Sequence, residues 1–182
     1  NFGILPVGGK TMVEGDKISK ERLSAALDPA IADISARLTH PHHRQMFAYW
    51  RGKFAGSVPP SRQDIDPVEI PPAILPWLVL YTVHWVADRP RIQFRLVGTS
   101  VVQRYHRDST GKYFEDVYDS AMLSKQMAAF SEVALKCQPA YAQLRLPVPE
   151  RDFIPYERLL LPLMGEDGRV EGIIAVMSFA PH

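Results

Sequence analysis

The residues best suited to metal chemistry are three histidines close together in the chain, His40, His42 and His43. Neutral imidazoles bind zinc, nickel or copper, but metal sites usually need three or four converging ligands. His40 and His43 share one face of the helix expected here. We interpret the cluster as solvated histidines at the start of that helix, with a pH-sensitive helix end as an intermediate alternative.

A second candidate for chemistry is the segment from Gly8 to Thr11, which looks like a phosphate-binding loop. The motif requires four residues between its outer glycines, whereas Gly3 and Gly9 are separated by five. No strand is expected before the segment and no helix opens at Lys10. We therefore interpret it as part of a flexible N-terminal arm.

Nucleophilic and acid–base catalysis also lack support in the sequence. No serine lies in a Gly-x-Ser-x-Gly motif. The single cysteine, Cys137, lies on the apolar stripe of a predicted helix, where a thiol is normally inert packing. Adjacent carboxylates at Glu115-Asp116 and Glu166-Asp167 point apart in turns. We predict that the protein is not an enzyme.

Net charge and cysteine content indicate which kinds of partner and which cellular compartment suit the protein. The 21 Lys and Arg residues nearly balance 20 Asp and Glu, so the excess charge typical of non-specific nucleic-acid binders is missing. One cysteine excludes an intrachain disulfide and favours a reducing, cytoplasmic location. Prolines within Ile70 to Ala87 leave an apolar run shorter than the ~20 residues of a membrane span. A buried strand is expected there.

Helical spacing predicts an N-terminal helical part. Two short helices are expected between Ser19 and Leu38, separated where Asp28-Pro29 caps the second. Thr39-His40-Pro41 caps another helix, over His43–Lys53, which ends at Gly52 and Gly56. The apolar residues of these helices are Leu23, Ala26, Leu27, Ile31, Ile34, Leu38, Met46, Phe47 and Trp50.

The rest of the chain is predicted to be rich in strands, with one long helix at Ser120 to Cys137. In the second strand, Ile92, Phe94 and Leu96 are expected on one face and Arg95 on the other. Thr99 is expected to cap a short helix that ends at Tyr105. The predicted strands are Trp77–Val86, Arg91–Gly98, Ala140–Val148, Tyr156–Leu163 and Val170–Phe179. The order of elements predicts an α+β fold with a five-stranded antiparallel sheet.

Five short motifs sharpen this prediction because they occur in a fixed order. They are Pro60-Ser61-Arg62 with Asp66-Pro67, Ile74-Leu75-Pro76, Phe94 to Thr99, Asp108 to Gly111, and Glu157 to Leu163 with Asp167-Gly168. Together they resemble the stand-alone PAS-like family of alphaproteobacteria, over about Trp50 to Ser178. The resemblance implies a PAS-like sheet with helices on one face. We expect an N-terminal arm and helical extension at residues 1–45 and the PAS-like domain at 46–182.

The resemblance also implies a sensory or regulatory module that binds a small molecule or a partner protein and signals in trans. The alternative is a ligand-free interaction or dimerisation domain with a filled core. We expect a homodimer formed through the N-terminal helices. Flavin- and haem-binding PAS branches depend on particular Cys or His positions that this family's motifs lack, so the cofactor stays unassigned.

A ligand is expected between the long helix and the facing strands. The candidate residues are Tyr81, Phe94, Arg95, Tyr105, Arg107, Phe114, Met127, Phe130 and Met177. In the sharper hypothesis, Arg95 with Arg107 holds the carboxylate or phosphate of an anionic ligand. The alternatives are that Arg95 and Arg158 form ion pairs with Glu157 or Asp108, and that the apolar candidates simply fill the core.

Overall fold

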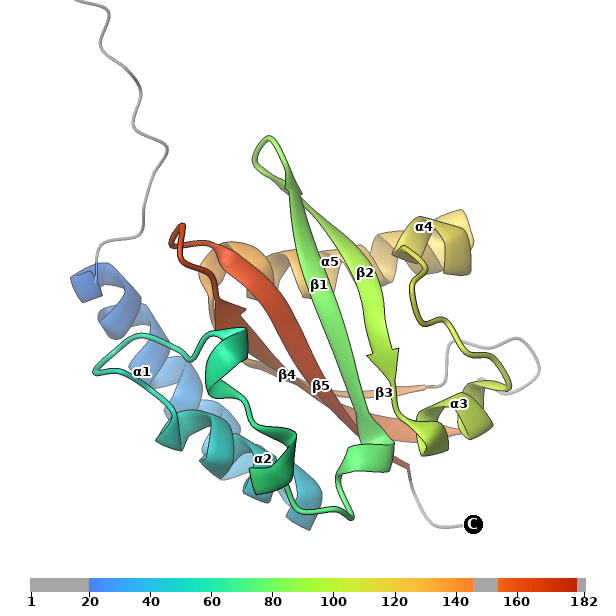
Figure 1. Ribbon diagram of the computed structural model, residues 1–182, viewed down its shortest axis with the longest axis horizontal. Coiled ribbons are helices and arrows are strands. Elements are labelled where there is room, and N and C mark those ends of the chain that lie inside the picture. The colour runs from blue at the N-terminus through green and yellow to red at the C-terminus, as the bar shows by residue number, and fades with distance from the viewer. Residues whose placement is uncertain (1–19, 146–153, 180–182) are drawn as a thin grey trace, which may run out of the picture.

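The structure, a computed structural model, describes residues 20–145 and 154–179, in which five strands form one antiparallel sheet (Figure 1). The strand order is β2-β1-β5-β4-β3, and each neighbouring pair is antiparallel. This confirms the predicted α+β fold class. The strands are β1 (Leu78–Val86), β2 (Arg89–Val97), β3 (Ala140–Arg145), β4 (Pro155–Met164) and β5 (Val170–Phe179).

Both predicted hairpins are present. The β4–β5 turn contains Gly168 at φ 78°, a conformation that glycine adopts without strain. The β1–β2 turn is tighter than expected, because Arg89 already pairs with Val86 and Pro90 with Trp85. The predicted residues 146–148 at the end of β3 lie outside the described residues, as do residues 1–19 with the glycine-rich segment.

The alternation predicted for β2 is wrong at one position, Leu96. Leu96 pairs with Leu80, whereas the next pair is Phe94 with Tyr81, so Arg95 is an extra residue in a β-bulge. Cross-strand partners point to the same face of a sheet. The bulge therefore moves Leu96 away from Phe94 to the opposite face, beside Leu80.

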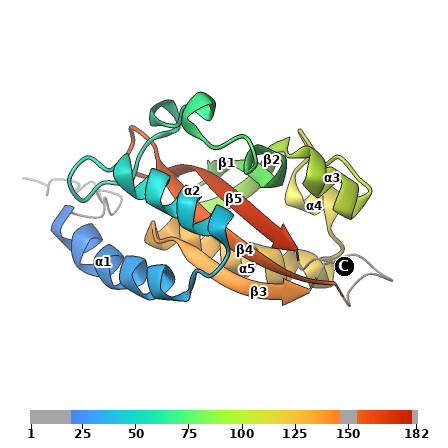
Figure 2. The same cartoon turned by 90° about the horizontal axis from the view of Figure 1, so that it is seen from below.

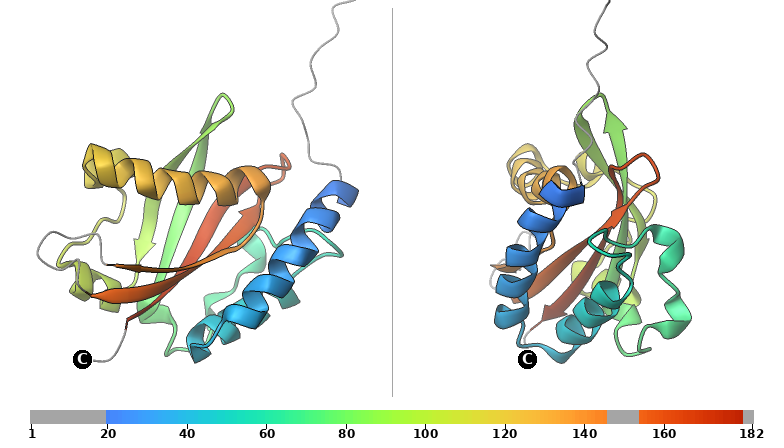
Figure 3. Two further views of the ribbon diagram at one scale, coloured as in Figure 1. Left: turned by 180° about the vertical axis from the view of Figure 1, so that it is seen from behind. Right: turned by 90° about the vertical axis from the view of Figure 1, so that its left-hand side faces the viewer.

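One face of the sheet is covered by α3 (Thr99–Tyr105), α4 (Phe114–Val117) and α5 (Ser120–Lys136), and α5 crosses the strands (Figure 3). Asp119 caps α5, since its carboxylate accepts a hydrogen bond from the Met122 amide at 2.9 Å. The predicted cap of α3 is wrong. Gly98 occupies the cap position without a side-chain hydrogen bond, and Thr99 is the first helical residue.

The predicted break at Asp28-Pro29 is also wrong, because α1 is one helix over Lys20–Arg37 with Pro29 inside it. A proline interrupts one backbone hydrogen bond of a helix. Here the buried side chains of Leu27 and Ile34 lie on either side of Pro29, so packing stabilises the continuous helix. The predicted cap before α2 (Pro41–Gly52) is confirmed, because His40 accepts a hydrogen bond from the His42 amide, although the helix begins two residues before the predicted His43.

Helix α2 and the connection from α2 to β1 cover the second face of the sheet. In Figures 2 and 3, α2 and the connection to β1 lie on the side opposite α5, while α1 lies along the β3 edge. Trp50 is fully buried, and its indole nitrogen donates to the Pro162 carbonyl of β4 at 2.9 Å. A second core results, containing Ile34, Leu38, Met46, Phe47, Trp50, Ile70, Ile74, Leu78, Tyr141, Leu159, Leu161, Leu163, Ile174 and Val176. Strand β1 is apolar on both faces because both are buried.

Candidate ligand-binding site

Seven of the nine candidate ligand residues meet on the helix-covered face of the sheet. The side chains on this face form a core between the sheet and α5. The seven candidates that belong to this core or pack against it are Tyr81, Phe94, Tyr105, Phe114, Met127, Phe130 and Met177. Their aromatic rings fill the space between sheet and helices. The ring centroids of Tyr81 and Phe130 are 4.7 Å apart, and those of Phe114 and Phe130 are 4.9 Å apart.

Little room for a ligand is left among these rings. The cavity lined by Tyr81, Phe94, Tyr105 and Met177 has a volume of about 20 Å³. A single water molecule needs roughly 10–15 Å³ by the same kind of measure. The helix-covered face therefore holds a filled core next to a void of about one water molecule.

The same core contains a buried cation, Arg158 of β4, which is 5% exposed. It donates from Nη1 to the Gln126 side-chain oxygen of α5 at 2.6 Å, and its guanidinium lies 5.1 Å from the Phe130 ring centroid. Among the described residues its Nε has no hydrogen-bond partner. Neither Glu157 nor Asp108 forms the ion pair that we expected for Arg158. Sequence reasoning missed Gln126, although its spacing of four from Phe130 places it on the apolar stripe.

The two arginines of the anion hypothesis do not share a site. Arg107 lines the small cavity under the helices and donates to the Val117 carbonyl at 3.2 Å. Arg95 lines a separate cavity on the other face of the sheet. Alternation along β2 places Arg95 on the face opposite Phe94 and the helices, so its proximity to Arg107 in the sequence was misleading.

The cavity next to Arg95 has a volume of about 690 Å³ and lies between the sheet and the connection from α2 to β1. Its lining is largely apolar. From the sheet come Leu78, Leu80, Tyr81, Arg95, Leu96, Leu163, Glu171, Gly172, Ile173 and Ile174, and from the connection Arg62, Ile65, Pro67, Ile70 and Leu75. We name it the second-face cavity.

Three charged residues line the second-face cavity: Arg62, Arg95 and Glu171. Glu171 accepts a hydrogen bond from the Arg62 backbone amide at 3.0 Å. Burial, with the nearby carboxylates of Asp167 and Glu166, raises the pKa of Glu171 above its usual range. Arg95 is exposed, and no described residue forms an ion pair with it.

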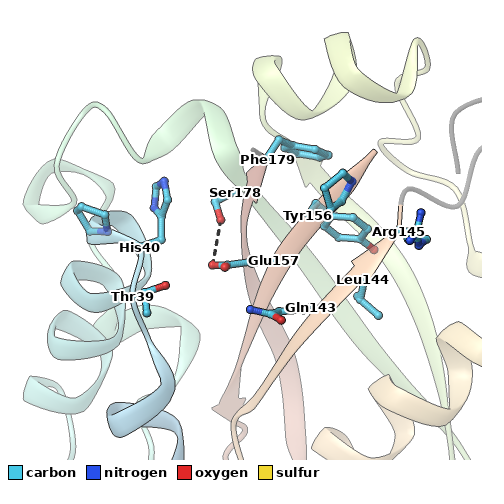
Figure 4. A pocket seen from close by; sticks show the side chains of 11 residues that line it. Thr39, His40, Gln143, Leu144, Arg145, Tyr156, Glu157, Ser178 and Phe179 are labelled. Atoms are coloured by element: carbon cyan, nitrogen blue, oxygen red, sulfur yellow. Dashed lines mark hydrogen bonds between the residues drawn. The ribbon is translucent and has the colours of Figure 1, made fainter. Parts of the chain in front are cut away.

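A third hollow, of about 970 Å³, opens where the start of α2 meets β3, β4 and β5 (Figure 4). The Glu157 carboxylate lies at its centre and accepts a hydrogen bond from the Ser178 hydroxyl at 3.4 Å. Figure 4 shows Thr39 and His40 on the opposite side of the hollow, with Gln143 next to Glu157. Its walls mix polar side chains with the apolar Leu144, Tyr156 and Phe179, and the hollow is more open to solvent than the second-face cavity.

His40 of the histidine cluster lines this hollow. His43 is fully buried, with its Nδ1 3.5 Å from a Glu157 oxygen, and burial lowers the pKa of His43 to about 4. Its ring lies 5.4 Å from that of His40, and the rings of His40 and His42 are 4.9 Å apart. In the described part of the chain, no three His, Cys, Asp or Glu side chains are grouped to hold a metal ion.

A comparison with protein families decides the identity of the fold. A family described as PAS domain matches residues 38–178, which is most of the chain. The chain belongs to the PAS domain family. The predicted resemblance is therefore confirmed, while its restriction to alphaproteobacteria stays a prediction. No curated protein matches the chain.

Family membership supports a sensory, regulatory or interaction module, since PAS domains are generally of this kind rather than catalytic. Cys137 in this PAS domain is a poor nucleophile, because burial raises the pKa of its thiol to about 12. None of the helices within the described ranges has the length and apolar character that a membrane crossing requires.

Proposed function

We propose that this PAS domain is a sensory or regulatory module that binds a small molecule and signals in trans to a separate protein. The observation that carries the proposal is the second-face cavity, with a volume of about 690 Å³ and a largely apolar lining. Small-molecule sites in proteins typically have volumes of roughly 300–1,000 Å³, mostly apolar walls and a few polar groups. The filled core under α5 supports the opposite face as the binding site.

Native mass spectrometry of the purified protein, under gentle and then denaturing conditions, tests this proposal. We expect an additional mass that is lost on denaturation, and a rise in Tm when the same compound is added back, because a ligand bound only to the folded state stabilises it. The matched control is Leu80→Trp, which places a large ring in the second-face cavity. The control should lose both the adduct and the Tm shift. An apo mass in wild type, with no Tm shift from a metabolite library, would contradict the proposal.

The alternative function is a ligand-free interaction or dimerisation domain. The close ring packing around Phe114 and Phe130, with a void of about 20 Å³, favours it. A homodimer through the N-terminal helices stays a proposal. Their apolar residues Ile34, Leu38 and Trp50 are buried against the chain's own sheet, so such a dimer would use other residues of α1 and α2.

We further propose that the protein is not an enzyme, that it acts in the cytoplasm and that it has no nucleic-acid partner. The buried free thiol of Cys137 supports a reducing compartment, and the near-balanced charge supports the absence of a nucleic-acid partner. The boundary between the extension, residues 1–45, and the domain, residues 46–182, also stays a proposal.

Light scattering of the full chain would test the proposed homodimer, because it measures the oligomeric state directly.

A further inference from the structure

We infer that the second-face cavity binds an amphiphile with an apolar body and a single anionic head group, of the kind represented by a medium-chain carboxylate. The inference rests on the proposed function and names the ligand class for the same cavity. It follows from the floor of the cavity, from the position of Arg95 at its wall and from the placement of Glu171.

The floor of the cavity is built for an apolar body. Leu78 and Leu80 of β1, Leu163 of β4 and Ile174 of β5 all point to this face, and Ile65, Ile70 and Leu75 line it from the connection. Buried apolar surface of this kind contributes roughly 25 cal/mol per Å² when a ligand removes it from water. An entirely polar ligand would gain nothing from these walls.

Gly172 lines the floor of the cavity without a side chain. It lies two residues before Ile174 on β5 and pairs with Leu163, so a side chain at Gly172 would project into the same face. A Cβ built there would lie 3.1 Å from the Tyr81 carbonyl oxygen and 3.5 Å from a methyl group of Leu163. A side chain at Gly172 would therefore be crowded against the β1 backbone and would enter the floor of the cavity, which Gly172 lines.

The head group is assigned by Arg95. Strand alternation alone would not set this side chain next to both Leu80 and Leu96, but the bulge places it at the wall they share. No described residue neutralises its charge through an ion pair. A guanidinium binds a carboxylate through two parallel hydrogen bonds, which fixes the orientation of the bound molecule.

Glu171 limits the ligand to one negative charge. Its carboxylate lines the same cavity, and burial, with the nearby Asp167 and Glu166, raises its pKa. A second carboxylate of a ligand next to Glu171 would add to the repulsion among these like charges. Two arginines, Arg62 and Arg95, line the cavity together with this one carboxylate, which accepts a hydrogen bond from the Arg62 backbone amide. The balance accommodates a single anionic head and disfavours a dicarboxylate or a cationic amphiphile.

The test compares decanoate, decanol and decylammonium below their critical micelle concentrations, with Kd measured by calorimetry and Tm measured in parallel. We expect decanoate to bind most tightly and decylammonium least tightly. Arg95→Gln should weaken decanoate binding by about 10- to 100-fold, the range for a lost hydrogen bond to a charged group. The same variant should leave decanol binding unchanged, because decanol uses only the apolar walls.

The matched control is Arg89→Gln, which removes the same charge from the same strand outside the cavity. It should bind decanoate like wild type. Leu80→Trp should abolish binding of decanoate and decanol alike, and Ile65→Trp, which fills the cavity from the connection, serves if Leu80→Trp is misfolded by circular dichroism.

Equal affinities for decanoate and decanol, or an unchanged decanoate Kd in Arg95→Gln, would overturn the anionic head while leaving the proposed small-molecule function intact. No binding of any of the three probes would overturn the amphiphile class. A native mass-spectrometric adduct of different chemistry would then still support the proposed function. Failure of the proposed function itself is the absence of any adduct, so the two failures are distinguishable.

Discussion

At the scale of single residues, the pair formed by Arg158 and Gln126 combines a buried charge with a neutral partner. Taking a guanidinium out of water is unfavourable unless hydrogen bonds replace the hydration. Gln126 supplies one acceptor at 2.6 Å, and the ring face of Phe130 adds a cation–π contact. The side-chain amide of Gln126, although uncharged, therefore contributes to the stability of this part of the core by replacing a hydrogen bond that Arg158 would make with water.

We predict that Gln126→Leu lowers the free energy of unfolding by about 1–3 kcal/mol, because it leaves the Arg158 Nη1 donor without a partner. The double variant Gln126→Leu with Arg158→Met should recover much of this loss, since it replaces both polar partners with apolar ones. Urea unfolding of the two single variants and the double variant measures the coupling. If the losses of the two single variants simply add up in the double variant, the predicted coupling between Gln126 and Arg158 is contradicted. The control is Ser124→Ala, on the exposed side of α5, which should leave the free energy of unfolding unchanged.

Gly98 illustrates a glycine required by close packing rather than by its backbone angles. Its φ is −62°, which any residue adopts, but a Cβ there would lie 2.3 Å from the Pro76 carbonyl oxygen and 2.7 Å from that of Leu78. The Gly98 amide also donates to the Leu78 carbonyl at 2.8 Å. The connection between β2 and α3 therefore packs directly on the backbone of Pro76 and Leu78, which leaves no space for a side chain at Gly98.

We predict that Gly98→Ala destabilises the fold by about 1–3 kcal/mol, the usual range for forcing atoms into filled space. Gly52→Ala is the matched control, because a Cβ there meets nothing within 4 Å, and its effect should stay within about 0.5 kcal/mol. Thermal unfolding of both variants provides the comparison. Equal Tm values for the two variants would show that the backbone at Pro76 can move aside.

Sequence reasoning succeeded for residues whose role is set by their neighbours along the chain. Gly168 and His40 act in a turn and at a helix cap, and both signals are local. The bulge at Arg95 was not predictable, because it exists only through pairing with Leu80 and Tyr81 of another strand. The bulge brings Leu96 to the second-face cavity, whereas most of the lining comes from other strands and from the connection between α2 and β1. Only Arg95 and Tyr81 of this lining were among the predicted site residues, because the sequence did not show which segment covers the second face of the sheet.

At the scale of elements, the start of α2 joins the N-terminal extension to the sheet through His43. Its ring is buried against Tyr141, with ring centroids 5.9 Å apart, and it faces Glu157. Burial is the main cause of its low pKa and the neighbouring His40 and His42 add to it, while Glu157 opposes them. The folded state holds His43 neutral where the unfolded chain would protonate it.

We predict that stability falls as the pH is lowered from about 6.5 towards 4. Between these pH values the histidine of the unfolded chain is protonated, whereas His43 in the folded state, with a pKa of about 4, stays neutral. The free energy of unfolding therefore decreases by about 3 kcal/mol as the pH falls across this range. His43→Phe should flatten this part of the pH profile. His106→Asn, at an exposed histidine, should not, and a profile unchanged by His43→Phe would exclude His43 as the source.

The elements themselves show what patterning predicts and what it misses. The length of α5 and its buried residues Phe130, Val133 and Ala134 follow from an apolar stripe that is visible in the sequence. The continuity of α1 through Pro29 does not, because it depends on where Leu27 and Ile34 pack. The surface that the extension covers was equally inaccessible, since an apolar helix face indicates burial without naming the partner.

At the scale of the whole molecule, the single sheet separates two cores and is shared by both. Strand β1 directs Val79 and Tyr81 to the core under α5, and Leu78 to the core under α2, with Leu80 at the second-face cavity. A molecule bound in that cavity would touch strands whose opposite side chains support the helices. The sheet is thus the physical route by which binding on one face could alter the other.

We predict that saturating decanoate slows amide hydrogen exchange in residues 62–77 and in β1, and also in α5. The reason is that stabilising β1 stabilises Tyr81, whose ring packs 4.7 Å from Phe130 of α5. Decanoate added to Leu80→Trp should change none of these rates. Protection confined to residues 62–77 would mean that the ligand stays local to its cavity, and a signalling surface would then have to lie on the connection itself rather than on the helices across the sheet.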